Sequence, residues 1–201
     1  VMNIKKVEKS TAKRQQILDS AVAVFAEKGF YNAKVTDIAH KAGIAHGTVY
    51  LYFQTKEDIL IQIFEEKFEE LVSYIFMEVG TEKNALAKLR RLILIQLQMV
   101  ETNPELTELM LLEARQSSKF ILSSAISKIG DYCDKIEGIL KEGIEEGLVR
   151  PDLDLTVAST MLYSGIEGIA TRWMLENKHY NLNLCAEQLI QLFIGGIRNL
   201  P

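Results

Sequence analysis

The chain has 201 residues, of which 48% are hydrophobic and 25% charged, and its formal net charge is −4 at pH 7. This content is typical of a globular protein that buries a substantial core. Cys133 and Cys185 lie far apart in sequence and form no ligand cluster with histidine, so we expect neither a zinc site nor a disulfide framework. No apolar run has the length of a membrane span, and the N-terminal ten residues lack the apolar core of a signal peptide, so we expect a cytoplasmic protein without a membrane partner.

Apolar residues recur at helical spacing along nearly the whole chain, which predicts an all-α fold of about nine helices. The first helix is expected to start at Ser10 or Thr11 and to end at Gly29. Its apolar stripe consists of Ile17, Leu18, Ala21, Val24 and Phe25. Two short helices near 36–42 and 46–52 follow, and then a long helix that runs from the Thr55–Asp58 capping box to about Val79.

After Gly80 the pattern predicts helices near residues 82–101, 105–115, 118–146, 153–176 and 184–199. The segment from Leu89 to Val100 is apolar almost all round, which indicates a central helix of a second domain. Such a helix is either plain core or the wall of a cavity, and the pattern leaves both possibilities open. We therefore expect an N-terminal helix-turn-helix domain of three helices, residues 1–55, and a C-terminal helical domain, residues 56–201.

Charge is distributed unevenly between these two parts. Residues 1–56 contain nine Lys and Arg against four acidic residues, a balance of +5, and the remaining chain has a balance of −9. Because neutralisation of phosphates dominates affinity for DNA, a basic head on an acidic body favours a DNA-binding N-terminal domain. Chance clustering of charge is the alternative.

Residues 35–53 fit two short helices that cross through a tight turn. Ala39 allows close packing, Gly43 can take the left-handed conformation of the turn, and Ile38, Ile44 and Val49 are expected to form the shared core. No acidic residue occurs between Asp37 and Glu57, although the chain contains 27 of them. Carboxylates would repel phosphates, so this gap supports DNA binding by the second short helix.

This segment resembles the signature of the TetR family of regulators. The matching residues are Thr36-Asp-Ile-Ala39, Ala42-Gly-Ile, Gly47-Thr-Val-Tyr50, Tyr52-Phe53 and Lys56-Glu-Asp-Ile-Leu60, and the resemblance extends upstream to cover roughly residues 10–65. Ala45 departs from it, because the family usually places a serine there to cap the second helix.

The resemblance implies a regulator that reads palindromic operator DNA as a homodimer, with no catalytic residues, metal or cofactor. It assigns contacts with DNA to Thr36, His46, Gly47, Thr48, Tyr50, Tyr52 and Lys56, with His46 as the candidate for base specificity. A histidine that merely starts a helix is the alternative for His46. The basic residues Lys5, Lys6, Lys9, Lys13 and Arg14 either track phosphates or form a solvated tail.

The last two helices resemble the dimer interface of the family, and packing within one chain is the alternative. The candidate contacts are Ser164, Gly165 and Gly168 on one helix and Leu189, Leu192, Phe193, Gly196 and Ile197 on the other.

The C-terminal part further resembles the repressors of fatty-acid degradation that respond to acyl-CoA. Three segments carry this likeness: Glu113-Ala-Arg115-Gln116, Gly143-Ile-Glu-Glu-Gly147 with Arg150-Pro-Asp152, and Gly165-Ile-Glu-Gly168 with Arg172-Trp173. A long-chain acyl-CoA effector requires an apolar tunnel with a cation near its mouth. The expected walls are Leu92, Gln96, Met99, Met110, Tyr132, Ile136, Met161 and Gly165, and the expected cation is Arg115, for which a surface salt bridge is the alternative.

Three alternatives compete with this interpretation, and one of them, a helical protein-interaction module, would not show steeply salt-sensitive binding of DNA. An enzyme is disfavoured because the sequence contains no nucleophile elbow, phosphate-binding loop or zinc-protease motif. A TetR-type regulator of multidrug efflux is the third alternative, and it would need buried carboxylates to bind cationic drugs. Ligand charge therefore separates the two kinds of regulator.

Overall fold

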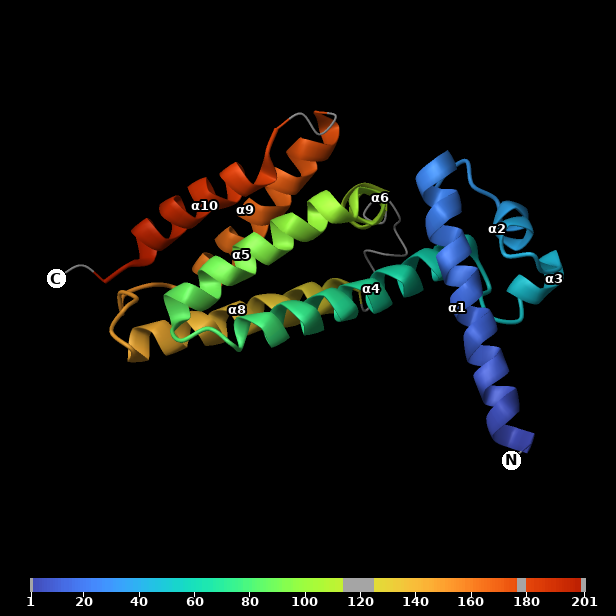
Figure 1. The fold of residues 1–201 in the computed structure, drawn as a ribbon, viewed down its shortest axis with the longest axis horizontal. Helices are drawn as coiled ribbons and strands as arrows, with labels where there is room; N and C mark the ends of the chain where they lie inside the picture. The colour runs from blue at the N-terminus through green and yellow to red at the C-terminus, as the bar shows by residue number, and fades with distance from the viewer. Residues whose placement is uncertain (1, 114–124, 177–179, 200–201) are drawn as a thin grey trace. The chain divides into compact units, whose positions relative to one another are not determined.

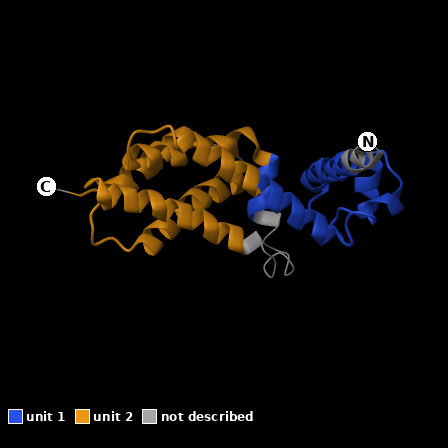
Figure 2. Cartoon of the chain, turned by 90° about the horizontal axis from the view of Figure 1, so that it is seen from below, with its two compact units in different colours: residues 1–67, 105–125 blue, residues 68–104, 126–201 orange. Residues whose placement is uncertain are grey.

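A computed structural model describes residues 2–113, 125–176 and 180–199 of the chain (Figure 1). The described residues form helices, joined by short turns and loops, and one isolated β-bridge. They divide into two compact units (Figure 2). Unit 1 comprises Val1–Lys67 and Glu105–Ala125, and unit 2 comprises Phe68–Pro104 and Ile126–Pro201. The first half of α4 thus belongs to unit 1, whereas the sequence placed the boundary after residue 55.

Unit 1 contains α1 (Met2–Lys28), α2 (Val35–Lys41), α3 (His46–Val49) and the first part of α4 (Lys56–Val79). The expected apolar stripe of α1, from Ile17 to Phe25, is at most 3% exposed. Ile38 and Val49 are fully buried, whereas Ile44 is only half-buried. The expected shared core is therefore confirmed at two of its three positions.

Three helix boundaries in this unit are set by local features of the chain, a positive φ angle at two of them and a capping box at the third. Gly29 and Gly43 have φ angles of 72° and 63°, which L side chains rarely adopt, and each ends a helix. The capping box of α4 is confirmed, because Thr55 N–H donates to Asp58 Oδ2 at 3.0 Å and Asp58 N–H donates to Thr55 Oγ1 at 3.1 Å.

Two expected boundaries in unit 1 were wrong. Helix α1 begins at Met2, not at Ser10 or Thr11, because residues 2–10 contain no proline or glycine that would stop a helix. Helix α3 ends at Val49, not near residue 52, because Leu51 N–H and Tyr52 N–H bond to carbonyls three residues back, which replaces the α-helical pattern with turns.

The expected helix at 105–115 is two elements, α6 (Pro104–Glu108) and a π-helix, η1 (Leu109–Glu113). Helix η1 packs against α1 within unit 1.

Unit 2 is a bundle of the second part of α4 with α5 (Ala85–Thr102), α8 (Ala125–Glu145), α9 (Leu155–Leu175) and α10 (Leu182–Ile197) (Figure 1). Asparagine or aspartate caps start three of these helices: Asn84 Oδ1 accepts from Ala87 N–H, Asp154 Oδ1 from Val157 N–H, and Asn181 Oδ1 from Asn183 N–H.

Helix α5 is the centre of this bundle and packs against both α9 and α10. Leu89, Leu92 and Ile93 have no exposed surface, which confirms the expected central helix.

One end of unit 2 is closed by an antiparallel bridge between Val149 and Arg198. Arg150 N–H donates to the Ile197 carbonyl and Asn199 N–H to the Leu148 carbonyl, both at 3.0 Å. These bonds fix the end of α10 to the turn that follows α8.

Candidate DNA-reading surface and effector site

The second short helix presents its polar residues to solvent. His46 and Gly47 are exposed, Tyr50 is 48% exposed, and Thr48 is half-buried. The rings of His46 and Tyr50 meet edge to face with centroids 5.0 Å apart, which orients the two side chains relative to each other. A Cβ at Gly47 would meet nothing within 4 Å, so this position leaves room for another molecule.

The other two expected DNA contacts in this region also have accessible surface. Thr36 is exposed in the first turn of α2, and Tyr52 is half-buried just after α3. At the start of α3, Ala45 makes no side-chain cap, in agreement with its departure from the family signature.

Asp37 anchors the start of α2. Its carboxylate accepts from Lys34 N–H at 3.0 Å and pairs with Lys28 Nζ at 3.0 Å. The bond from Lys28, followed by that from Lys34 N–H, lowers the pKa of Asp37 below its ordinary value of 3.8. The Asp37 carboxylate at the start of α2 is thus ionised and bonded to groups of the protein itself.

Lys56 differs from its expected role in this structure. Its ammonium group donates to the carbonyls of Phe30 at 2.6 Å, Tyr31 at 3.2 Å and Ala33 at 3.0 Å. It also lies 4.5 Å from the centroid of the Phe30 ring. An ammonium has three donors, and here the protein itself uses all three. In this structure the ammonium group of Lys56 is bonded within the protein, and a phosphate contact by Lys56 stays a prediction.

Arg14 is a second basic residue that the protein uses internally. It donates to Gln62 Oε1 at 2.6 Å, pairs with Glu66 Oε1 at 2.5 Å and lies 5.6 Å from the centroid of the Phe53 ring. These contacts join α1 to the first part of α4, so Arg14 is bonded within the protein, which differs from both alternatives, a phosphate contact and a solvated tail. The side chains of Lys5, Lys6 and Lys9 lie outside the described residues.

The sequence interpretation missed Leu51, which is 81% exposed directly after α3. Its spacing in the sequence did not reveal it, because Leu51 lies after the end of α3, where its N–H bonds to the Thr48 carbonyl at 3.2 Å in a turn. An exposed apolar side chain beside polar, acid-free neighbours can meet a thymine methyl group or a sugar.

The interior of unit 2 brings together four of the expected wall residues. Tyr132 and Ile136 lie one turn apart on α8, and Leu92 and Gln96 lie one turn apart on α5. Tyr132 Oη donates to Gln96 Oε1 at 2.7 Å, so these two faces meet. Tyr132 is 1% exposed, and its burial raises the pKa of its hydroxyl well above the ordinary value of 10.

An aromatic cluster of Phe68, Phe76, Tyr132 and Tyr163 fills the space around this pair. The rings of Phe68, Phe76 and Tyr163 lie 6.0, 5.9 and 5.9 Å from that of Tyr132, all edge to face. These three residues were not among the expected walls, because an aromatic side chain at helical spacing has the same sequence pattern in a solid core and around a ligand.

Two other expected wall residues lie elsewhere. Met161 is 64% exposed, so its expected place in an interior wall was wrong: it falls on the outer face of α9. Gly165 faces α10 in the same chain, because a Cβ there would lie 3.4 Å from Leu189 Cδ1.

The remaining residues of the expected effector site are not joined to Tyr132 and Gln96 by any described contact. Met99 is half-buried on α5, and Met110 lies in η1 of unit 1. Arg115, the expected cation, lies outside the described residues.

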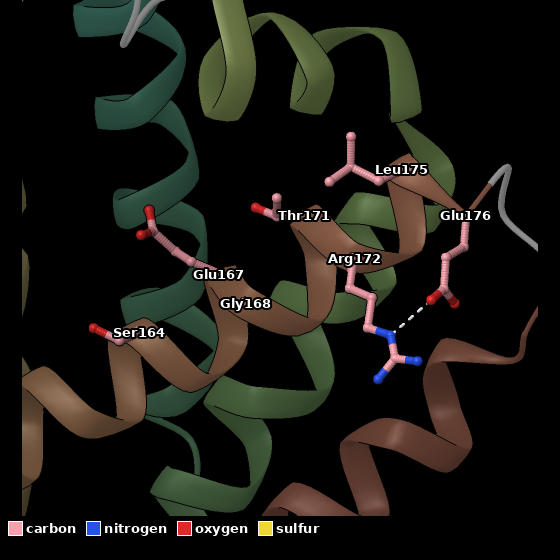
Figure 3. A pocket seen from close by; sticks show the side chains of 7 residues that line it. All are labelled: Ser164, Glu167, Gly168, Thr171, Arg172, Leu175 and Glu176. Carbon is pink, nitrogen blue, oxygen red and sulfur yellow. Dashed lines mark hydrogen bonds and ion pairs between the residues drawn. The ribbon is translucent and has the colours of Figure 1, made fainter.

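The outer face of α9 contains an open groove of about 490 Å³ (Figure 3). Its lining residues are Ser164, Glu167, Gly168, Thr171, Arg172, Leu175 and Glu176. The groove runs beside an ion pair between Arg172 Nε and Glu176 Oε1 at 2.9 Å, which raises the pKa of Arg172.

Large apolar side chains lie exposed on this helix and on α10. Leu175 is 68% exposed and Leu192 is 75% exposed. Of the expected dimer residues, Ser164, Gly168, Leu192 and Gly196 are exposed. Ile197 is only 4% exposed, which contradicts its expected place in an interface.

The comparisons with known proteins match both parts of the chain. Residues 17–63 match the family model "Bacterial regulatory proteins, tetR family", and residues 64–196 match "YsiA-like protein, C-terminal region". The "Fatty acid metabolism regulator protein" of Bacillus subtilis is 33% identical over 187 residues, which cover 93% of this chain and 96% of that protein.

Two solved structures agree with this assignment. The fatty acid degradation regulator FadR from Bacillus halodurans superposes with a TM-score of 0.85 at 32% identity, over 94% of this chain and 97% of that one. FadR from Bacillus subtilis, solved in complex with stearoyl-CoA, superposes with a TM-score of 0.81 at 33% identity, over 91% of this chain and 98% of that one. The chain belongs to the TetR family of bacterial regulatory proteins.

Proposed function

We propose that this protein is a repressor of fatty-acid-degradation genes that binds a palindromic operator as a homodimer and leaves it when a long-chain acyl-CoA binds. The observation that carries the proposal is full-length similarity, at 33% identity, to a regulator of fatty acid metabolism and to the FadR solved with stearoyl-CoA. The relatives are regulators, which supports a regulatory rather than an enzymatic role, in the cytoplasm where the operator lies.

The exposed surface of α3 and the residues after it supports DNA binding. His46, Gly47, Tyr50 and Leu51 are exposed on a segment that contains no acidic residue. One such helix contacts too few bases for a specific site, so a dimer is required to read two half-sites. The exposed apolar side chains of α9 and α10 are suited to that dimer.

The interior of unit 2 supports an acyl rather than a cationic effector. Among the residues whose exposure is described, the buried side chains of unit 2 are apolar or aromatic apart from Ser159. An acyl chain needs such walls, whereas a cationic drug needs a carboxylate beside it. We propose that the faces of α5 and α8 around Tyr132 line the acyl site.

Release from DNA requires that the effector bind one arrangement of the dimer more tightly than the other. Helix α4 has half of its length in each unit, so it is a continuous element through which a change in unit 2 can reach unit 1. We propose that acyl-CoA favours a separation of the two DNA-reading helices that no longer fits adjacent major grooves.

Two measurements on the full chain test the proposal. The first is a thermal-shift series with acyl-CoAs of graded chain length, free fatty acids and cationic dyes, because a ligand of the native state raises stability by mass action. The second is the affinity for a selected palindromic duplex with and without the best ligand. A melting temperature that rises with acyl length and a weakened DNA complex support the proposal. A shift with cationic dyes alone overturns the acyl-CoA effector and leaves DNA binding intact.

A further inference from the structure

Lys56, the first residue of α4, uses its ammonium group for hydrogen bonds within the protein. Its ammonium group donates to three main-chain carbonyls, those of Phe30, Tyr31 and Ala33, at 2.6 to 3.2 Å. The Phe30 ring lies 4.5 Å from the nitrogen and is 3% exposed, so the cation rests against the core of unit 1. We define Lys56 and these three carbonyls as the lysine clamp.

The clamp joins two stretches of chain that bracket the helix-turn-helix. Residues 30–33 lie between α1 and α2, and Lys56 follows α3. The segment between them, which includes α2, the Gly43 turn and α3, therefore has its two ends joined by the Lys56 side chain.

Separate contacts fix the chain on either side of this closure. Asp37 accepts from Lys34 N–H just after the carbonyls, and Thr55 and Asp58 form the capping box around Lys56 itself. Arg14 bonds Gln62 and Glu66, which holds the next turns of α4 to α1. The position of α3 therefore depends on where the clamp places the start of α4.

We propose that Lys56 is a positioning residue for DNA recognition, which acts by closing the helix-turn-helix loop and not by neutralising a phosphate. The inference rests on the DNA-binding role of the family. Each direct phosphate contact contributes about 0.9 to the slope of log affinity against log salt concentration, and it acts on specific and non-specific DNA alike. A positioning residue instead supports the fit of α3 to base edges, so its loss lowers the affinity for the specific site.

The test compares Lys56→Gln, Lys56→Arg and the wild type, as full chains, on two duplexes. One duplex is a palindrome selected from random DNA by the wild type, and the other is a scrambled sequence of the same length. Lys41→Gln is the matched control, because it removes one positive charge from the exposed end of α2 without touching the clamp. Affinities are measured by fluorescence anisotropy between about 50 and 200 mM salt, at a temperature where circular dichroism shows each variant fully folded.

We expect Lys56→Gln to lose about tenfold or more in affinity for the selected palindrome, which corresponds to about 1.4 kcal/mol. Its affinity for the scrambled duplex and its salt slope should match those of Lys41→Gln. Lys56→Arg should fail to restore the specific affinity, because the planar guanidinium cannot place three donors on carbonyls that surround a single ammonium nitrogen.

Two results would overturn the proposal. One is a salt slope of Lys56→Gln that is smaller in magnitude than that of Lys41→Gln by about 0.9 or more for each bound lysine, together with rescue of the affinity by Lys56→Arg. A phosphate contact would behave in this way. The other is unchanged specific affinity in Lys56→Gln. If the wild type selects no palindrome, the DNA-binding function fails and not the clamp alone.

Discussion

Leu51 has the highest exposure among the large apolar side chains described in this structure, at 81%, and it lies just after α3. We predict that Leu51→Ala lowers the affinity for the selected palindrome about five- to tenfold, because a contact with a thymine methyl group or a sugar is lost. The melting temperature should not change, since the side chain buries little surface in the free protein.

Met77→Ala is the matched control for Leu51→Ala, because Met77 is 62% exposed on α4 in unit 2. Anisotropy titrations and thermal melts of both variants check the prediction. Equal affinity of Leu51→Ala and the control would show that Leu51 does not touch DNA.

Tyr132 and Gln96 are partners in the interior of unit 2, and the cost of separating them is measurable. We predict that Tyr132→Phe lowers the free energy of unfolding by about 1–3 kcal/mol, because Gln96 Oε1 loses the hydroxyl that bonds it at 2.7 Å. Gln96→Leu should remove the unsatisfied oxygen, so the double variant should be more stable than the sum of the two single effects implies. Denaturant unfolding of the four proteins gives the coupling, and strict additivity would contradict a direct bond.

The sequence predicted that His46, Gly47 and Tyr50 lie on an exposed face, because a helix-turn-helix fixes their spacing, and their contacts with DNA stay predictions. It did not indicate the partners that Lys56 and Arg14 have within the protein. A basic residue near the head has the same sequence pattern whether its partner is a phosphate or a group of the protein, and both of these side chains bond to groups that are distant in the chain, the carbonyls of residues 30–33 for Lys56 and Glu66 for Arg14. Met161 was misassigned because the outer and inner faces of a largely apolar helix cannot be told apart by composition.

At the scale of elements, the start of α2 responds to pH through Asp37. Its pKa is lowered by Lys28 and by the Lys34 N–H, so the ionised carboxylate stabilises the fold. That contribution is fully present above the unfolded value of 3.8 and is lost as the pH falls through the lower folded value. We predict that Asp37→Asn is less stable than the wild type at pH 7 and that the difference shrinks below about pH 4.

Denaturant unfolding of the wild type and Asp37→Asn at a series of pH values checks this prediction, because subtraction removes the other carboxyl groups that titrate. A stability difference that stays constant down to pH 3 would contradict it.

Most helices began and ended close to their predicted positions because their stop signals are local. Gly29, Gly43 and Gly147 take positive φ angles, and Asn84 and Asp154 cap their helices. The errors fall where no local signal acts. The helix α1 continues back to Met2 through residues that merely tolerate it, and η1 adopts a π pattern after α6 that periodicity does not distinguish from an α-helix.

At the scale of the whole molecule, the exposed apolar side chains of α9 and α10 are suited to an interface between two copies of the chain. We predict that Leu192→Glu, at a position 75% exposed in the single chain, weakens the dimer about 100-fold or more, because two-fold symmetry places the charge in the interface twice. Sedimentation equilibrium measures the change, and affinity for the palindrome should fall with it.

Met77→Glu is the control for the dimer experiment, because it introduces the same charge at an exposed apolar position on α4. A Leu192→Glu protein that remains a dimer at the concentrations where the control does would exclude this face as the interface.

The order in which the chain enters the two units limits which chimeras keep unit 1 intact. Unit 1 takes in residues 1–67 and also residues 105–125, and η1 from the second stretch packs against α1. A chimera made by a single crossover after residue 55 or 67 would therefore pair the α1 of one parent with the η1 of another. A chimera that keeps α1 together with its own η1 therefore needs both stretches of unit 1 from the same parent.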